Sequence, residues 1–165
     1  MKENSFRSIS RDYSENRGNF NVISSGSEKD LLRTGKLLLD VGTFLTTLLQ
    51  TFRNSKIDVK PKKNILKKVI STLSATAKQI DVILNFIYDK DALREGRRLS
   101  YDMKRISDEL SYYNDMKDSE FEENQENLRE VIGLFGETNF RSSEFGDTIR
   151  HLIQKNKMKN YSGRY

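Results

Sequence analysis

The side chains that most often carry chemistry are scarce in this chain of 165 residues. It contains one histidine, His151, and no cysteine, which excludes a cysteine nucleophile, a thiolate metal site and a site with several histidine ligands. A Ser-His-Asp triad would have to use His151, which stands beside Arg150 with Lys155 and Lys157 nearby. We interpret it as an exposed or partly packed histidine. No phosphate-binding glycine loop, dinucleotide-binding glycine pattern or H-E-x-x-H motif occurs, so the sequence predicts a protein that is not an enzyme and holds no cofactor or metal.

Carboxylates are plentiful between residues 100 and 130, where ten acids and four basic residues give a net charge of −6. A di-metal helical bundle needs carboxylates that point inward from several helices, together with Glu-x-x-His motifs. That motif is absent here. We therefore interpret the acidic run from Asp115 to Glu126 as a solvated helix N-terminus, where the helix dipole favours negative charge.

Two basic clusters are the most informative feature of the sequence. Residues 56–68 hold six lysines and one acid, a net charge of +5, and residues 141–165 hold six basic residues and two acids, a net charge of +4. Lysines are mildly unfavourable at the start of a helix, and departures from a local rule are expected at functional sites. The candidate partner-binding residues are Lys60, Lys62, Lys63, Lys67, Lys68, Arg150, Lys155, Lys157 and Lys159.

Three interpretations of the lysines at 60–68 stay open at this point. They could pair with acids of the same chain (Asp118, Glu120, Glu122 and Glu123), dock on an acidic protein surface, or bind nucleic acid. A formal charge of +5 and a basic tail with two tyrosines fit a weak electrostatic footprint for nucleic acid. The acidic segment would repel phosphate, and neither helix-turn-helix spacing nor an RNA-module motif is present. The sequence therefore favours protein partners over nucleic acid.

The elements that position these residues are predicted to be helices. The chain has a single proline and no convincing strand pattern, and apolar residues recur at helical spacing over 28–54, 62–88, 90–116, 119–135 and 142–158. Short links imply antiparallel neighbours. We predict an all-α fold: an elongated antiparallel bundle of three long helices plus two shorter C-terminal helices, which fill the fourth position or fold back across one end. Residues 28–158 form the bundle, and residues 1–27 and 159–165 are flexible arms.

Heptad stripes indicate which faces are buried. In the first helix Leu31, Gly35, Leu38, Gly42, Leu45, Leu49 and Phe52 alternate at spacings of four and three, and a second apolar stripe makes the helix apolar on two faces. Its two glycines suggest a close helix crossing. The helix over 90–116 carries one such stripe, from Ala92 to Tyr113, and a charged outer face. The helix over 119–135 is expected to open on a capping box, Ser119 and Glu122.

These observations predict a non-enzymatic helical interaction protein, a subunit or accessory of a larger and oligomeric assembly. One concrete form is a structural component of a virus or phage particle. A basic nucleic-acid-binding accessory protein is the alternative. The first 20 residues lack the apolar core of a signal peptide, and the longest apolar stretch, 37–52, is shorter than the ~20 residues of a membrane span. We expect an intracellular protein, or one inside an assembled particle, without a membrane span.

Overall fold

A computed structural model describes residues 28–54 and 56–162, and the side chains of residues 28–54 and 56–158. The arm predicted for residues 1–27 lies outside the described residues. The six helices are α1 (Glu28–Arg53), α2 (Val59–Ile83), α3 (Lys90–Asn114), α4 (Asp118–Glu123), α5 (Gln125–Gly133) and α6 (Phe135–Ser162).

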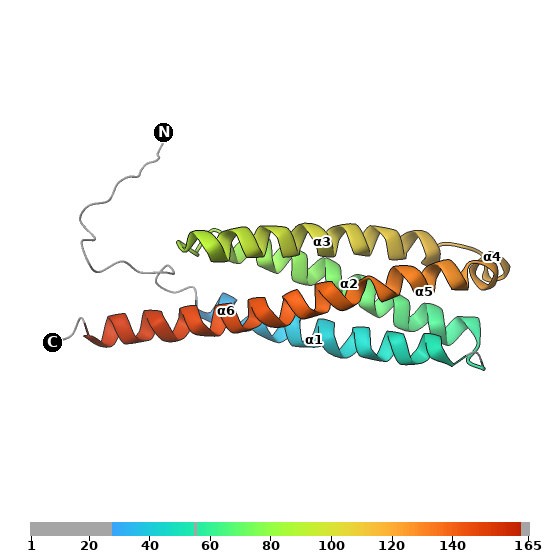
Figure 1. The fold of residues 1–165 in the computed structure, drawn as a ribbon, viewed down its shortest axis with the longest axis horizontal. Coiled ribbons are helices and arrows are strands. Elements are labelled where there is room, and N and C mark those ends of the chain that lie inside the picture. Colours follow the sequence, from blue (N-terminus) through green and yellow to red (C-terminus); the bar gives the residue numbers. More distant parts are fainter. Residues whose placement is uncertain (1–27, 55, 163–165) are drawn as a thin grey trace, which may run out of the picture.

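The described residues form one elongated bundle without a β-strand (Figure 1). α1 packs on α2, α2 on α3, and α6 closes the bundle against both α1 and α3. The α1–α2 link and α4 lie at one end, and the α2–α3 link lies at the other. The predicted all-α antiparallel bundle is confirmed, and the C-terminal helices fill its fourth position. Within the described part of the chain, no helix is long and apolar enough to cross a membrane.

The boundaries of α2 follow from its flanking residues. It begins at Val59, three residues earlier than the sequence indicated, because Pro61 fits within the first turn of a helix, where its missing N–H would have no partner. It ends at Ile83 rather than at 88. The carboxylate of Asp89 caps the next helix by accepting a hydrogen bond from the Ala92 backbone N–H at 3.0 Å, so the chain must leave the α2 helix before that point.

The C-terminal region is more helical than the sequence indicated. The predicted helix over 119–135 is divided into α4 and α5, and α4 begins at Asp118 with Lys117 at its N-cap, so the expected capping box at Ser119 does not form. α6 starts at Phe135, not at 142, and runs to Ser162, past the predicted end of the bundle at 158. Only Leu134 separates α5 from α6, with its N–H shared between the carbonyls of Glu130 and Val131. Burial of Phe135 and Thr138 outweighs the weak helix propensity of residues 136–139.

The buried residues of α1 differ in part from the predicted stripe. At every second position of the stripe, the residue before the predicted one is buried. Leu31, Leu38, Leu45 and Phe52 are buried as expected, but Thr34, Val41 and Leu48 lie between them instead of Gly35, Gly42 and Leu49. Thr34 is accepted in the core because its hydroxyl donates to the Asp30 carbonyl at 2.8 Å. Because the buried face lies one residue earlier than predicted, the two glycines lie on the side of α1 that faces α6. There, Gly35 and Gly42 line a surface groove.

The stripe predicted for α3 is confirmed from Ala92 through Leu110, with Tyr113 partly buried. Its one glycine, Gly96, has the closest neighbours of the described glycines. A Cβ at Gly96 would lie 2.7 Å from Leu84 Cδ2 and 2.9 Å from Phe145 Cζ. Leu84, just after α2, and Phe145 of α6 therefore both pack on the backbone of α3 at this position.

We expect the core to be sensitive to truncation on α1. Replacing Leu45, which is 2 % exposed, by Ala should lower the free energy of unfolding by about 2–5 kcal/mol, through lost burial and the cavity that remains. Chemical denaturation followed by circular dichroism measures the change. The matched control is Leu134→Ala on the surface, which should change stability by no more than about 0.5 kcal/mol. Equal effects of the two substitutions would contradict the assignment of α1 to the core.

Candidate functional site

The lysines at the start of α2 are divided between the interior and the surface. Lys62 is only 2 % exposed. Its Nζ donates to Gln125 Oε1 at 2.8 Å and lies 5.4 Å from the centre of the Phe52 ring. Lys63 is half-buried, donates to the Met116 carbonyl, forms an ion pair with Asp118 at 3.0 Å and lies over the Phe121 ring. Both lysines therefore join α2 to the segment that follows α3.

Burial changes the acid–base behaviour of Lys62. Desolvation, reinforced by the nearby charge of Arg129 and opposed by that of Glu122, holds the pKa of its ammonium group below the usual 10.5. No carboxylate in the described part of the chain forms an ion pair with it within 4.0 Å, and its ammonium group donates to the side-chain amide oxygen of Gln125. Lys62 is thus a structural group that stabilises this end of the bundle, and it is not available to an external partner.

The other three lysines of residues 60–68 are exposed. Lys60, Lys67 and Lys68 point to solvent and make no ion pair with another described residue. The interpretation of pairing within the chain is therefore correct for Lys63, whereas Lys62 is buried without a carboxylate partner. Lys60, Lys67 and Lys68 stay available for an acidic surface or for nucleic acid.

The basic residues of α6 do not converge on one site. Arg150 pairs with Asp147 on the same helix, and Lys157 pairs with Glu28 of α1 at 3.4 Å. Lys155 and His151 are exposed, and the side chain of Lys159 lies outside the described ones. Because Lys157 lies beside the first residue of α1, the last turns of α6 project beyond the other helices (Figure 1).

A groove of about 740 Å³ lies between α1 and α6, and we call it the α1/α6 groove. Of the described residues that line it, only Arg150 is charged, although 32 % of the whole chain is charged. The lining residues are Gly35, Leu38, Leu39, Gly42, Thr43, Thr46, Thr47, Gly136, Asn139, Phe140, Ser142, Ser143, Gly146 and Arg150. Small residues allow the two backbones to approach closely: a Cβ at Gly42 would lie 3.3 Å from Asn139 Oδ1.

Apolar side chains and satisfied hydroxyls dominate the rim of the groove. Leu39 and Phe140 are 67 % and 61 % exposed. The hydroxyls of Thr43, Thr46 and Thr47 donate to the carbonyls four residues earlier in α1, at 3.2, 2.9 and 3.1 Å. Because these donors already have partners, covering the face leaves few polar groups without hydrogen bonds. The sequence analysis missed this site, since α6 was not predicted to run beside α1 over 135–141.

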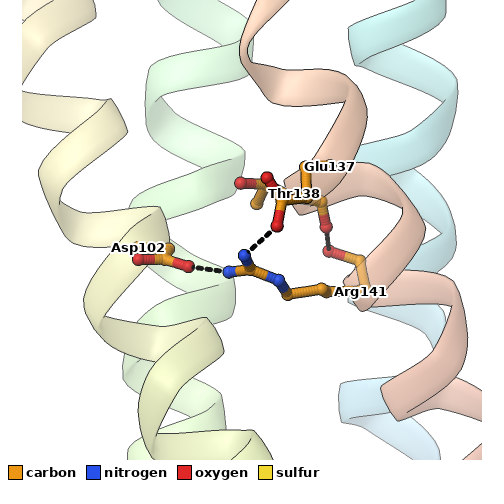
Figure 2. Close-up of polar contacts among 5 residues, drawn as sticks. Asp102, Glu137, Thr138 and Arg141 are labelled. Atoms are coloured by element: carbon orange, nitrogen blue, oxygen red, sulfur yellow. Dashed lines mark hydrogen bonds and ion pairs between the residues drawn. The ribbon is translucent and has the colours of Figure 1, made fainter.

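Polar contacts fasten α6 to α3 on the side away from the groove. Arg141 bridges Asp102 of α3 and Glu137 of its own helix, as Figure 2 shows, with the Arg141 and Asp102 side chains 22 % and 15 % exposed. About two helical turns further along α6, the Thr148 hydroxyl lies 3.2 Å from Glu95 Oε1. Burial raises the pKa of Glu95, assisted by Glu144 and Asp89 and opposed by the Thr148 hydrogen bond. These contacts hold the α6 wall of the groove in place.

Comparison with protein-family models, with curated proteins and with solved structures finds no significant match to this chain. Among the described residues, no group of three or more His, Asp or Glu side chains is placed to hold a metal ion. The α1/α6 groove and the exposed lysines of α2 are the two candidate sites among the described residues.

Lys62 should make stability depend on alkaline pH. Its folded-state pKa lies below the unfolded value of 10.5, so the unfolded chain binds more protons between the two values. The free energy of unfolding of wild type, relative to Lys62→Met, should rise as pH increases toward 10.5, by at most about 1.4 kcal/mol per pH unit. Urea denaturation over a pH series measures this difference. Lys67→Met is the control for loss of a surface charge, and equal slopes for the two variants would contradict burial of Lys62.

Proposed function

We propose that this protein is a non-enzymatic helical interaction protein that acts as a subunit or accessory of a larger assembly. The observation that carries the proposal is the α1/α6 groove: an open hollow with one charged lining residue, on a chain that is otherwise rich in charge. Depletion of charge at the centre of a surface patch, with aromatic and apolar side chains beside it, is typical of protein interfaces. A structural or accessory role in a virus or phage particle is one form that such a subunit would take.

The proposal also accounts for the rigid scaffold behind the groove. Leu38 and Phe145 are buried on the two helices that form it, and the Arg141–Asp102 pair fixes α6 against α3. A surface held in place by a packed core loses little conformational freedom when a partner binds, which favours affinity. The bundle would thus present a preformed docking face.

The test is the native size of the protein. In an extract of its native source, the tagged full-length chain should elute from a sizing column in a complex larger than the purified protein. Leu39→Arg with Phe140→Arg should shift it to the size of the purified protein, because an arginine in a desolvated interface costs several kcal/mol without a partner. The matched control is Tyr101→Arg on α3, which replaces a side chain of similar exposure, 66 %, and should leave the complex intact. Elution of wild type at the size of the purified chain would refute the proposal.

Nucleic-acid binding is the second candidate, favoured by Lys60, Lys67 and Lys68 on the outer surface of α2. Lys60 and Lys67 are seven residues apart and therefore share one side of the helix. Lys62 and Lys63 are excluded from this role by their contacts inside the bundle. Three lysines support a weak electrostatic contact with phosphates and no base readout.

We expect this contact to be weak and indifferent to sequence. Fluorescence anisotropy with labelled DNA and RNA should detect binding at low salt that falls steeply as salt is added, because phosphate contacts release counterions. Changing Lys60, Lys67 and Lys68 to Glu should abolish it without loss of helicity. Sub-micromolar, sequence-selective binding at physiological salt that this variant loses would make nucleic-acid recognition the primary function.

A further inference from the structure

We propose that the outer side of α2 and α3 binds single-stranded nucleic acid, with the phosphates on basic side chains and the bases stacked on tyrosines. The inference rests on the second candidate function, because it adds a class of nucleic acid and a mode of binding to the exposed lysines of α2. We call this surface the α2/α3 face. Its residues are exposed basic and tyrosine side chains: Lys60, Lys67, Lys78, Arg97, Tyr101, Lys104 and Tyr112.

A contact between α2 and α3 sets which of their residues share this face. The Ser100 hydroxyl of α3 lies 3.2 Å from the Ala77 carbonyl of α2. The two helices run antiparallel, so successive residues turn in opposite senses around the two helix axes when both are viewed from one end of the bundle. The residues that follow the contact, Lys78 and Tyr101, therefore lie on the same outer side of the pair, and both are exposed.

The α2 side of the face is a line of lysines. Lys60, Lys67 and Lys78 are seven and eleven residues apart, or about two and three helical turns, so they lie one above another over about 27 Å. None of the three forms an ion pair with another described residue. No acidic residue occurs between Asp58 and Asp81. This line therefore carries positive charge that α2 itself does not neutralise.

The α3 side adds further positive charge. Arg97 is exposed and forms no ion pair with another described residue. Lys104 pairs with Asp81 of α2 at 2.5 Å, so this pair is close to neutral. Two exposed acids, Asp108 and Asp115, lie on the same side toward the end of α3. The three lysines of α2 and Arg97 outnumber these two acids, so the face attracts anions and most strongly toward the α2–α3 link.

The tyrosines supply what a purely electrostatic surface lacks. Tyr101 and Tyr112 are 66 % and 67 % exposed, and they are eleven residues apart, so they share one side of α3 about 17 Å apart along its axis. The Tyr112 ring packs edge-on against Tyr113, with the ring centres 5.5 Å apart, which restrains its orientation. An exposed ring beside cations is a platform on which a nucleotide base stacks, a contact worth about 1–3 kcal/mol per base.

The shape of the face favours a single strand over a duplex. In a duplex the bases stack on one another and present only their edges, whereas an unpaired base can lie flat on a tyrosine ring. Two helices side by side are about 20 Å wide, since each has a diameter of about 10 Å. They cannot enter a major groove that is about 12 Å wide. A single strand can instead lie along the face, with its phosphates toward the lysines of α2.

The first experiment compares a short labelled oligothymidine strand with a duplex of the same length by fluorescence anisotropy at low salt. We expect the purified full-length protein to bind the single strand at least about tenfold more tightly. Tyr101→Ala with Tyr112→Ala should remove this preference and leave binding of the duplex unchanged. The matched control is Phe140→Ala on α6, which removes an aromatic ring of similar exposure, 61 %, and should have no effect. Equal affinities for the two probes in wild type, or a preference that survives loss of both tyrosines, would overturn the inference. Circular dichroism confirms that the variants are folded.

The second experiment uses the absence of tryptophan from the chain, which leaves tyrosine emission directly visible. Stacking of a base on a tyrosine quenches its fluorescence, so the oligothymidine strand should quench part of the emission of wild type. Tyr101→Phe with Tyr112→Phe should keep the affinity, because phenylalanine also stacks, but should lose the quenching. Binding without quenching in wild type, or equal quenching in this variant, would contradict stacking at these two positions.

The third experiment tests the cations through salt dependence. Lys78→Gln with Arg97→Gln should lower the slope of log affinity against log salt by about 1.4, or about 0.7 for each lost phosphate contact with a single strand. The control is Arg33→Gln with Lys36→Gln, which removes the same charge from exposed positions of α1 and should leave the slope unchanged. Equal slopes for the two variants would contradict the proposed position of the strand. Polyglutamate carries charge without bases, and competition as strong as that of oligothymidine would make the face a docking site for an acidic protein instead.

The inference and the functions proposed above fail separately. If neither probe binds at low salt, the second candidate function and the inference are both refuted. If the two probes bind equally and only the Glu variant of Lys60, Lys67 and Lys68 abolishes binding, the second candidate stands and the inference is refuted. The proposal for the α1/α6 groove depends on neither result, because its variants lie on α1 and α6.

Discussion

The absence of a side chain at Gly96 is the constraint on which the closure of the bundle depends. Leu84, which follows the last residue of α2, and the buried Phe145 of α6 both reach the position that a Cβ of Gly96 would occupy. α6 therefore packs directly on the backbone of α3 at this point. Arg141 with Asp102 and Thr148 with Glu95 then fasten the same face of α6 to α3 on either side of the crossing. With one face held in this way, α6 turns its small residues, Gly136, Asn139 and Gly146, toward α1.

The groove is a consequence of that orientation. α1 and α6 approach each other through glycine, asparagine and serine, which let the backbones come close but leave no bulky side chains to fill the surface above them. The contact between α2 and α3 is of a different kind, because polar bonds cross it: the Ser100 hydroxyl reaches Asp81 at 2.6 Å, and Lys104 reaches the other oxygen of Asp81 at 2.5 Å. Burial disfavours ionisation of Asp81, yet these hydrogen bonds and the charge of Lys104 hold its pKa below the usual value. One side of the bundle is thus closed by polar contacts, and the other stays open.

The sequence predicts most of the fold because the helical period is a local property. The stripe of α3 from Ala92 to Leu110 is correct because its opposite face is strongly charged, which leaves one orientation. α1 carries apolar residues on two faces, so its period alone cannot decide between Thr34 and Gly35, or between Val41 and Gly42, as core positions. That choice depends on where α6 lies. The helix over 135–141 was missed for the same reason, because burial of Phe135 and Thr138 by neighbouring helices overrides weak local propensity.

The structure gives the charged residues of α2 a different role from the one that the charge pattern suggested. The sequence suggests that the lysines of α2 bind a partner, yet Lys62 and Lys63 stabilise the bundle itself. Their Nζ atoms lie over the rings of Phe52 and Phe121 and contact Gln125 and Asp118, which follow α3 in the chain. The stretch of α1 from Leu37 to Phe52, in which Asp40 is the one charged residue, has the composition of a core helix, and one side of it is core. Its other side stays exposed at Leu39 and Thr43. Exposed apolar side chains gathered on one side of a helix are typical of interaction surfaces, and for this reason we place the proposed docking face on this side of α1.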